Sequence, residues 1–358
     1  MASRSNSEKW LAQLTHLPTA SGREDEVISW VRSWVHRRSD LNLTSDGGGN
    51  LLITQKGRKQ RAPVLAVAHM DHPAFVIGEV EGTDASFEFR GGVRPEYFED
   101  ASVEFVTGGA TTGRVTGYDP DTRTGKISVT GTRPVPGDIA RWRFVSQRPK
   151  MGRLLAPACD DLAGCAAALA ALDRARGRIG SRHFGVLLTR AEELGFVGAL
   201  HAAKTGSISP DSRILSIETS RASSDVPVGG GPVIRVGDAT TVFDHDLTNL
   251  ISRTVATRGI RHQRKLMSGG SCEATAFGAY GYRATGLCLP LGNYHNMGHL
   301  DEVEAGTVKA RAMMEEIALD DFHGLVDVLL LAIEAVDAKS DLSDRLDAVY
   351  AETRHLLT

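Results

Sequence analysis

VLAVAHMDHPAF, residues 64–75, places five apolar residues directly before a cluster of ionisable side chains. The five apolar residues have the length and composition of a strand that is buried on both faces. His69, Asp71 and His72 follow at once. Buried strands of this kind form open α/β sheets, which bind ligands at the carboxyl ends of their strands. The stretch therefore predicts an α/β fold with a polar site at one edge of its sheet.

Bulk composition excludes several classes of partner. The chain has 358 residues, of which 41% are hydrophobic and 24% charged, as in ordinary globular proteins. Its net charge of −3 gives no reason to expect nucleic acid or membrane as a partner. The four cysteines lack the paired spacing of a zinc knuckle or a disulfide framework. No secretory signal is recognisable at the N-terminus, so we expect a cytoplasmic protein.

Helix and strand patterns alternate over residues 1–75 and again over 151–358. Near the start, Ser21 and Glu24 have the spacing of a capping box ahead of a second helix. Near the end, residues 317–336 have a helical pattern throughout. The alternation predicts one catalytic-type α/β domain with a mostly parallel sheet flanked by helices.

Residues 76–150 have a different pattern. Short runs rich in Val, Thr and Phe are separated by Gly and Asp about every ten residues, which is typical of an all-β sandwich or small barrel. Glu79, Glu88 and Glu104 alternate with apolar residues, as solvent-facing strand positions do. We therefore expect an inserted β-rich domain.

Ionisable residues follow four predicted strands or open the central helix: His69 and Asp71, Glu192 and Glu193, Glu218, His295, and Asp160 with Asp161. Each has a structural explanation when taken alone, since paired aspartates cap helices and paired glutamates often face solvent. Their combination at one sheet edge predicts a metal site. Imidazole and carboxylate without thiolate suit Zn²⁺, with Co²⁺ or Mn²⁺ as substitutes. Two histidines and three carboxylates exceed the needs of one catalytic zinc and suit two ions, roughly 3.5–4 Å apart.

Five motifs resemble those of the deblocking and glutamyl aminopeptidases that form tetrahedral particles, within the co-catalytic zinc exopeptidases. They are LPTASGREDEV, SDGGGNLLI, AHMD, ACDDLAG and TRAEELGFVGA. The resemblance covers most of the chain, including the position of the β insertion. It implies a metal-dependent aminopeptidase that acts on short peptides.

The resemblance also implies a role for each site residue. His69, Asp160 and Glu218 would hold one zinc ion, and Asp160 would share the second ion with Glu193 and His295. Glu192 would be the general base for the catalytic water. Asp71 would orient His69.

Four features depart from the family pattern. His72, Pro73 and Ala74 replace a usual Glu-Ile-Gly, and Leu162 replaces a usual arginine. Glu218 stands where an aspartate is typical. A long segment after His295 offers His299 as a rival ligand. These departures leave the substrate preference and the assembly open.

Two other functions are compatible with the sequence. One is a carboxypeptidase, dipeptidase or amide deacylase with the same metals, although those branches usually carry their extra domain after the Glu-Glu motif. The other is a degenerate peptide-binding or scaffold relative, against which the intact Glu192 argues. The family likeness further implies a homo-oligomer, a dodecamer or else a dimer.

Overall fold

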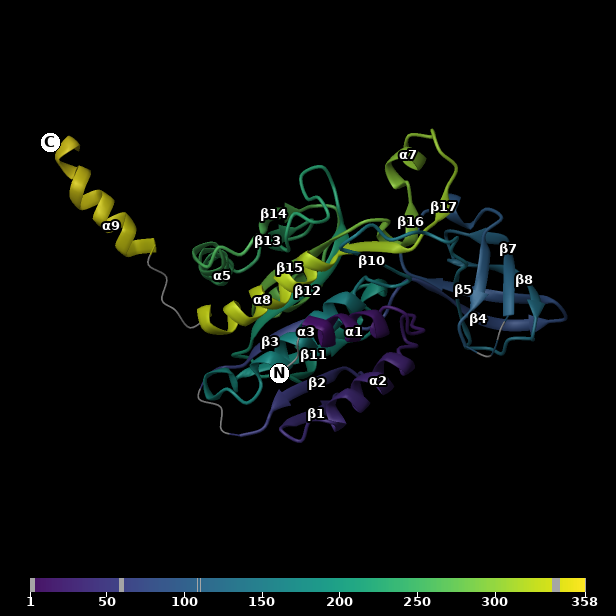
Figure 1. Ribbon diagram of the computed structural model, residues 1–358, viewed down its shortest axis with the longest axis horizontal. Helices are drawn as coiled ribbons and strands as arrows, with labels where there is room; N and C mark the ends of the chain where they lie inside the picture. The colour runs from purple at the N-terminus through teal and green to yellow at the C-terminus, as the bar shows by residue number, and fades with distance from the viewer. Residues whose placement is uncertain (1–3, 58–60, 108, 110, 337–341, 358) are drawn as a thin grey trace.

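The computed structural model describes residues 4–57, 61–107, 109, 111–336 and 342–357 (Figure 1). It confirms a mixed α/β fold. The strands of the central sheet are β1 (Leu41–Ser45), β2 (Leu51–Gln55), β3 (Val64–His69), β11 (Phe184–Thr189), β12 (Arg213–Arg221), β13 (Val233–Asp238), β14 (Gln263–Met267) and β15 (Arg283–Leu291). Their order across the sheet is β1-β2-β11-β3-β12-β15-β13-β14.

The middle of this sheet is parallel. β11, β3, β12 and β15 run in the same direction, so their carboxyl ends meet at one edge. The pairings β1–β2, β2–β11 and β13–β15 are antiparallel, and β13–β14 is parallel. Neither β13 nor β14 was predicted from the sequence. The charged residues of QRKLM in β14 hide its strand character.

Helices cover both faces of the sheet. The helices of the described residues are α1 (Arg4–Leu14), α2 (Asp25–His36), α3 (Leu162–Ala175), α4 (Val197–Thr205), α5 (His245–Thr257), α6 (Glu273–Ala279), α7 (Leu300–Glu304), α8 (Leu319–Ala335) and α9 (Leu342–Thr353). Of these, α7 and α9 lie away from the sheet (Figure 1). Short 3₁₀ turns are η1 (Pro95–Phe98), η2 (Ile179–Ser181), η3 (Glu192–Leu194), η4 (Tyr294–Asn296) and η5 (Arg354–Leu357). Among the described residues, no helix is long and apolar enough to cross a membrane.

Alternate side chains of β3 enter two separate hydrophobic clusters. Val64, Ala66 and Ala68 pack with residues of α1, α2, α3, α5 and α8 on one face. Leu65 and Val67 pack with residues of α4 and α6 on the other. Burial on both faces explains why this strand is apolar without a break.

The predicted capping box at α2 does not form. Glu24, not Ser21, occupies the N-cap position, and no side chain caps the helix there. The Ser21 hydroxyl instead donates to Asp71 Oδ2 at 2.6 Å. A tertiary partner has therefore displaced the local one that the spacing suggested.

Six strands beyond β3 close into a barrel at one end of the molecule (Figure 1). They are β4 (Ala74–Glu81), β5 (Asp84–Arg90), β6 (Ser102–Phe105), β7 (Thr111–Asp119), β8 (Thr124–Gly131) and β9 (Ile139–Trp142). Phe75 lies at the centre of the barrel, with its ring centroid 4.9 Å from Phe87 and 4.7 Å from Trp142. Glu79 and Glu88 are exposed.

Two separate two-stranded ribbons lie between the central sheet and the barrel (Figure 1). β10 (Arg153–Ala156) pairs with β18 (Glu315–Ala318), and β16 (Met297–Gly298) pairs with β17 (Arg311–Ala312). The helix predicted from residue 317 begins only at Leu319, because the two preceding residues belong to β18. Gly292 and Glu316 exchange two backbone hydrogen bonds at the base of the second ribbon. We call residues 293–315 the ribbon segment.

Candidate metal centre

The predicted site residues lie together beyond the carboxyl ends of the parallel strands. His69 is the last residue of β3, and Glu218 lies in the second half of β12. Glu192 and Glu193 form η3 after β11, and His295 lies in η4 after β15. Asp160 lies between β10 and α3. Each side chain is at most 10% exposed: His69, Asp160, Glu192, Glu193, Glu218 and His295.

Asp160 lies between the two histidines. Its Oδ1 is 3.4 Å from His69 Nε2, and its Oδ2 is 3.4 Å from His295 Nε2. On one side, Glu218 Oε1 lies 3.4 Å from His69 Nε2. On the other, Glu193 Oε1 lies 3.3 Å from His295 Nε2. The cluster therefore has two halves that share one aspartate.

The second ring nitrogen of each histidine has a partner that fixes its orientation. His295 Nδ1 donates to the carbonyl of Gly92 at 2.6 Å. His69 Nδ1 lies 3.2 Å from the carbonyl of Asp71 and 3.4 Å from its Oδ1. Since a carbonyl only accepts, these contacts place a proton on Nδ1 and leave Nε2 as the ligand atom. Gly92 comes from the barrel side of the chain, so both parts of the protein build this site.

Electrostatics favour a cation at this position. Burial lowers the pKa of His69 and His295, but nearby carboxylates, Glu192 and Glu193 foremost, raise both pKa values well above the usual range. Burial likewise raises the pKa of Asp160, but the two histidines outweigh it and leave this pKa well below its ordinary value. The cluster thus attracts positive charge, whether proton or metal ion.

The residues present fit a metal centre. Asp160 Oδ1, Glu193 Oε1 and Glu218 Oε2 are buried oxygens without a hydrogen-bond partner among the described residues. Buried carboxylate oxygens in that condition are costly unless they coordinate a cation. His69–Asp160–Glu218 and Asp160–Glu193–His295 each offer ligand atoms within 4.8 Å of one another. Imidazole and carboxylate are the ligand types of catalytic zinc.

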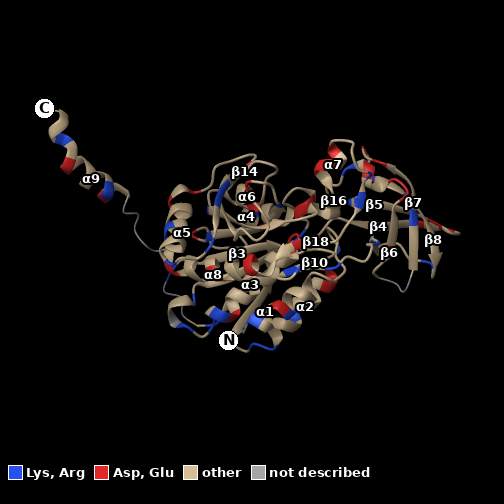
Figure 2. Ribbon diagram, turned by 45° about the horizontal axis from the view of Figure 1, so that its top comes forward, with Lys and Arg blue, Asp and Glu red and all other residues tan. Residues whose placement is uncertain are grey.

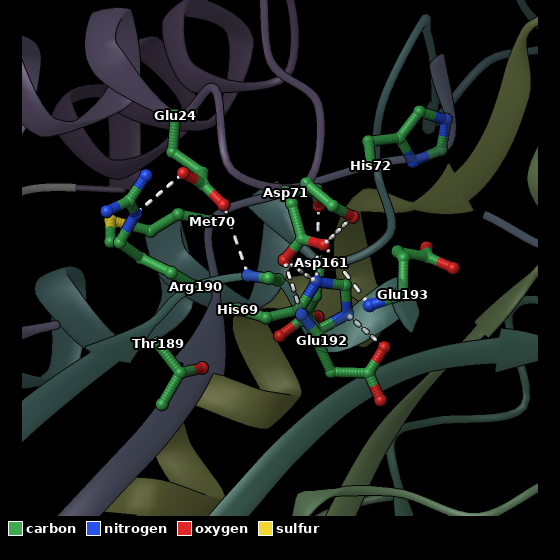
Figure 3. A network of polar contacts seen from close by, with 12 residues as sticks. Glu24, His69, Met70, Asp71, His72, Asp161, Thr189, Arg190, Glu192 and Glu193 are labelled. Atoms are coloured by element: carbon green, nitrogen blue, oxygen red, sulfur yellow. Dashed lines mark hydrogen bonds and ion pairs between the residues drawn. The ribbon is translucent and has the colours of Figure 1, made fainter. Parts of the chain in front are cut away.

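Asp71 links the first histidine to the neighbouring Glu-Glu turn (Figure 3). Its Oδ1 accepts from the backbone N–H of Glu192 at 3.0 Å, and its Oδ2 accepts from that of Glu193 at 3.1 Å. Glu192 Oε2 lies 3.9 Å from His69 Nε2. Burial, together with the surrounding carboxylates, raises the pKa of Glu192 well above its ordinary value, so this group binds a proton more readily than a solvated glutamate does.

Comparisons with known proteins point to peptidases. The M42 glutamyl aminopeptidase family matches residues 134–308. A putative aminopeptidase of Acetivibrio thermocellus is 23% identical over 285 residues, which are 74% of this chain and 83% of the relative. Over those residues the chain resembles the M42 peptidases. It is thus an enzyme, a metallo-exopeptidase of the aminopeptidase type.

Solved structures share the fold of this chain. The TET aminopeptidase of a marine sediment archaeon of the Thaumarchaeota has a TM-score of 0.76 at 19% identity, over 93% of this chain and 97% of that one. The TET1 peptidase of Pyrococcus horikoshii, which assembles into a tetrahedron or a large octahedral shell, has a TM-score of 0.73 at 21% identity. That match covers 94% of this chain and 100% of the TET1 chain.

The peptidase also uses a buried carboxylate that sequence reasoning missed. Glu315 is fully buried, and its Oε2 accepts from the backbone N–H groups of Cys159 at 2.6 Å and Asp160 at 3.0 Å. Its Oε1 accepts from the backbone N–H of His295 at 2.9 Å. One side chain therefore holds the backbone of two site residues from distant parts of the chain. In the sequence, Glu315 and Glu316 are only an acidic pair shortly before a helix, a pattern that does not predict this role.

The unusual His72 has a structural role in the peptidase. Its Nδ1 donates to the Asp160 carbonyl at 2.6 Å, and its Nε2 lies 3.1 Å from Asn296 Oδ1. Leu162 is buried in the hydrophobic core. His299 is exposed at the start of α7, so the structure brings His295 and not His299 to the cluster.

Two further contacts hold the backbone of the site. Glu24 accepts from Arg190 Nε at 2.7 Å and from the Ala191 N–H at 3.1 Å, just before the Glu-Glu turn (Figure 3). Asp161 Oδ1 accepts from the Thr219 hydroxyl at 2.7 Å. A Cβ on Gly164 would lie 2.3 Å from that same Oδ1, so only glycine fits there.

A cavity of about 790 Å³ opens beside the candidate metal ligands of the peptidase. Its walls come from the loop after β12, from β14 and the loop that follows it, and from the ribbon segment. Across the cavity, Arg221 pairs with Asp301 and Glu304, and Arg94 of the barrel region also pairs with Glu304. These ion pairs connect three separate parts of the wall.

Proposed function

We propose that the peptidase removes N-terminal residues from short peptides with the help of two metal ions, zinc being the best match. His69, Asp160 and Glu218 would hold one ion. Asp160, Glu193 and His295 would hold the other. The position of Asp160, with one oxygen towards each histidine at 3.4 Å, carries this proposal because a shared carboxylate is the signature of two-metal hydrolases.

The bound ions would polarise the scissile carbonyl and lower the pKa of the attacking water. Glu192 would accept the proton of that water and return it to the leaving amine. A pKa raised above the ordinary value makes Glu192 a better proton acceptor than a solvated carboxylate. Asp71 would hold the Glu192 backbone and the His69 ring in fixed relative positions.

The cavity would receive the N-terminal residue of the substrate. Two positively charged side chains in its wall make a substrate residue with an acidic side chain the best fit. Arg235 and Lys265 are register partners on β13 and β14 and line the cavity. Arg235 Nε is buried without a hydrogen-bond partner among the described residues. Arg94 and Arg221, by contrast, are already paired with carboxylates. The glutamyl aminopeptidase description of the matched family is consistent with this preference.

A matched pair of variants tests the preference. Lys265→Ala should lower kcat/KM for glutamyl p-nitroanilide about tenfold and leave leucyl p-nitroanilide nearly unchanged, because only the acidic substrate loses a charge partner. Lys126→Ala, on the distant barrel strand β8, is the control. An equal loss on both substrates would show that Lys265 does not select charge.

The peptidase would act as a homo-oligomer, a dodecamer or else a dimer, as the TET neighbours assemble into shells. The β-rich domain would contribute to subunit contacts and limit access to short peptides. Light scattering that shows a fully active monomer would refute this assembly. The cytoplasmic setting stays a prediction.

Glu192→Gln, assayed together with metal content, tests the catalytic proposal. The variant should keep its metal and fold but lose about 10²–10⁴-fold in kcat, the usual contribution of a general base. Glu88→Gln, on the exposed face of the barrel, is the control. N-terminally blocked peptides separate the aminopeptidase from a carboxypeptidase or amide deacylase, because those two do not need a free amine. Peptides of three or more residues separate it from a dipeptidase. A zinc-loaded protein inactive on every amino-acid p-nitroanilide would favour the scaffold reading.

A further inference from the structure

The C-terminal helix α9 exposes an apolar stripe. It stands away from the rest of the chain, at the end opposite the barrel, and none of its residues is buried (Figure 1). Leu346, Val349 and Tyr350 are 60%, 57% and 58% exposed. A helix of 12 residues is marginal in water unless its apolar face packs against something. The stripe therefore needs a covering surface.

The spacing of the stripe is that of a coiled coil. Leu342, Leu346, Val349 and Thr353 are separated by four, three and four residues, so they occupy alternating d and a positions of a heptad. Two charged residues, Arg345 and Glu352, both fall at g positions beside the stripe. Neither side chain has an ion-pair partner among the described residues, and both signs of charge are visible on α9 in Figure 2.

Charge complementarity selects one pairing of this helix with itself. In an antiparallel pair with Leu346 opposite Val349 of a second copy, Arg345 lies beside Glu352 of that copy, and the reverse contact forms by symmetry. A shift by one heptad would place two Arg345 or two Glu352 side chains together. A parallel pair would place Arg345 beside Tyr350, where no charge is matched.

We propose that α9 joins two copies of this chain as an antiparallel helix pair in that register. Four core layers form, Leu342 with Thr353 and Leu346 with Val349, each twice. Such a contact is too small to hold a dimer alone, since stable interfaces bury about 1,200–2,000 Å². It adds to other contacts in an assembly, where linked copies have a high effective concentration for one another. This contact is independent of the proposed catalytic function.

Complementary charge variants of the full-length protein test the pairing in sedimentation velocity. Arg345→Glu alone and Glu352→Arg alone should each weaken self-association about tenfold, because each turns two attractions into two repulsions. An equimolar mixture of the two variants should recover wild-type association, since every contact between unlike copies is again attractive. Asp344→Arg and Arg354→Glu make the same charge changes outside the interface, and both should behave as wild type.

Three results would overturn the proposal. The first is association of either single variant equal to that of the controls. The second is a mixture that associates no better than its components, which would mean that α9 docks on another surface or on a different protein. The third is a chain ending at Val336 that assembles with unchanged mass and affinity. Activity on a p-nitroanilide substrate serves as the folding check for every variant.

Discussion

Replacing Glu315 by Gln should loosen the metal centre without touching a ligand. The carboxylate accepts three backbone hydrogen bonds, from Cys159, Asp160 and His295. The amide has one oxygen, so even in its better orientation it keeps only the two bonds now made by Oε2. The N–H of His295 then faces an NH₂ group and is left unsatisfied.

The expected cost follows from that count. A lost hydrogen bond to a charged group contributes about 1.5–3 kcal/mol. Burial raises the pKa of Glu315 to about 7, so part of the carboxylate is already protonated at neutral pH and the lower value applies. We expect a loss of about 1.5 kcal/mol in unfolding free energy, or about 2 °C in melting temperature at an unfolding entropy of about 2.1 cal/mol/K per residue. Metal affinity should fall about 10–100-fold, as when groups that orient metal ligands are removed.

Thermal melts and competition with a chelator measure these two quantities. Glu316→Gln is the matched control, since Glu316 is the next residue along the chain and its side chain is 22% exposed. The control should change stability by less than about 0.5 kcal/mol. A Glu315→Gln variant that melts and holds metal like this control would refute the reasoning.

Chelation should lower the melting temperature of the loaded protein, because ions that bind only the native state stabilise it; an unchanged melt would argue against a native metal site. Asp160→Asn should leave at most trace metal in elemental analysis, because both halves of the cluster lose their shared carboxylate. Asp173→Asn should destabilise the protein by about 3 kcal/mol at pH 7, since it breaks a buried contact to Arg38 Nε at 2.6 Å. Burial raises the pKa of Asp173, but Arg38 and Arg176 outweigh it and keep this pKa below its ordinary 3.8, so its stabilisation is present above that pH and lost as pH falls. Denaturant titrations should therefore show the gap between Asp173→Asn and wild type closing below about pH 4, and a constant gap would contradict this assignment.

The sequence was most informative where one local pattern determined the structure. Val64 to Ala68 had to be a strand buried on both faces, and the position of His69 at its end followed from that. The sequence-based prediction was wrong where a tertiary contact determined the partner of a side chain. Ser21 has a capping spacing, but Asp71 binds its hydroxyl.

The role of Glu315 could not be predicted from the sequence for the same reason. Its role depends on backbone N–H groups that two distant loops bring together, and no periodicity records such a meeting. β13 and β14 were missed because Arg235 and Lys265, which line the cavity, interrupt the apolar pattern of a strand.

The closed base of the ribbon segment has an evolutionary consequence. The backbones of Gly292 and Glu316 are hydrogen-bonded to each other. Further along the same ribbon, the Met313 N–H donates to the Asn296 carbonyl. The entropy of closing a loop rises only slowly with its length. Changes of length or charge in residues 299–310, beyond this closed stem, should therefore leave His295 in place. Related lineages can remodel this wall of the cavity, and with it the choice of substrate, without rebuilding the chemistry underneath.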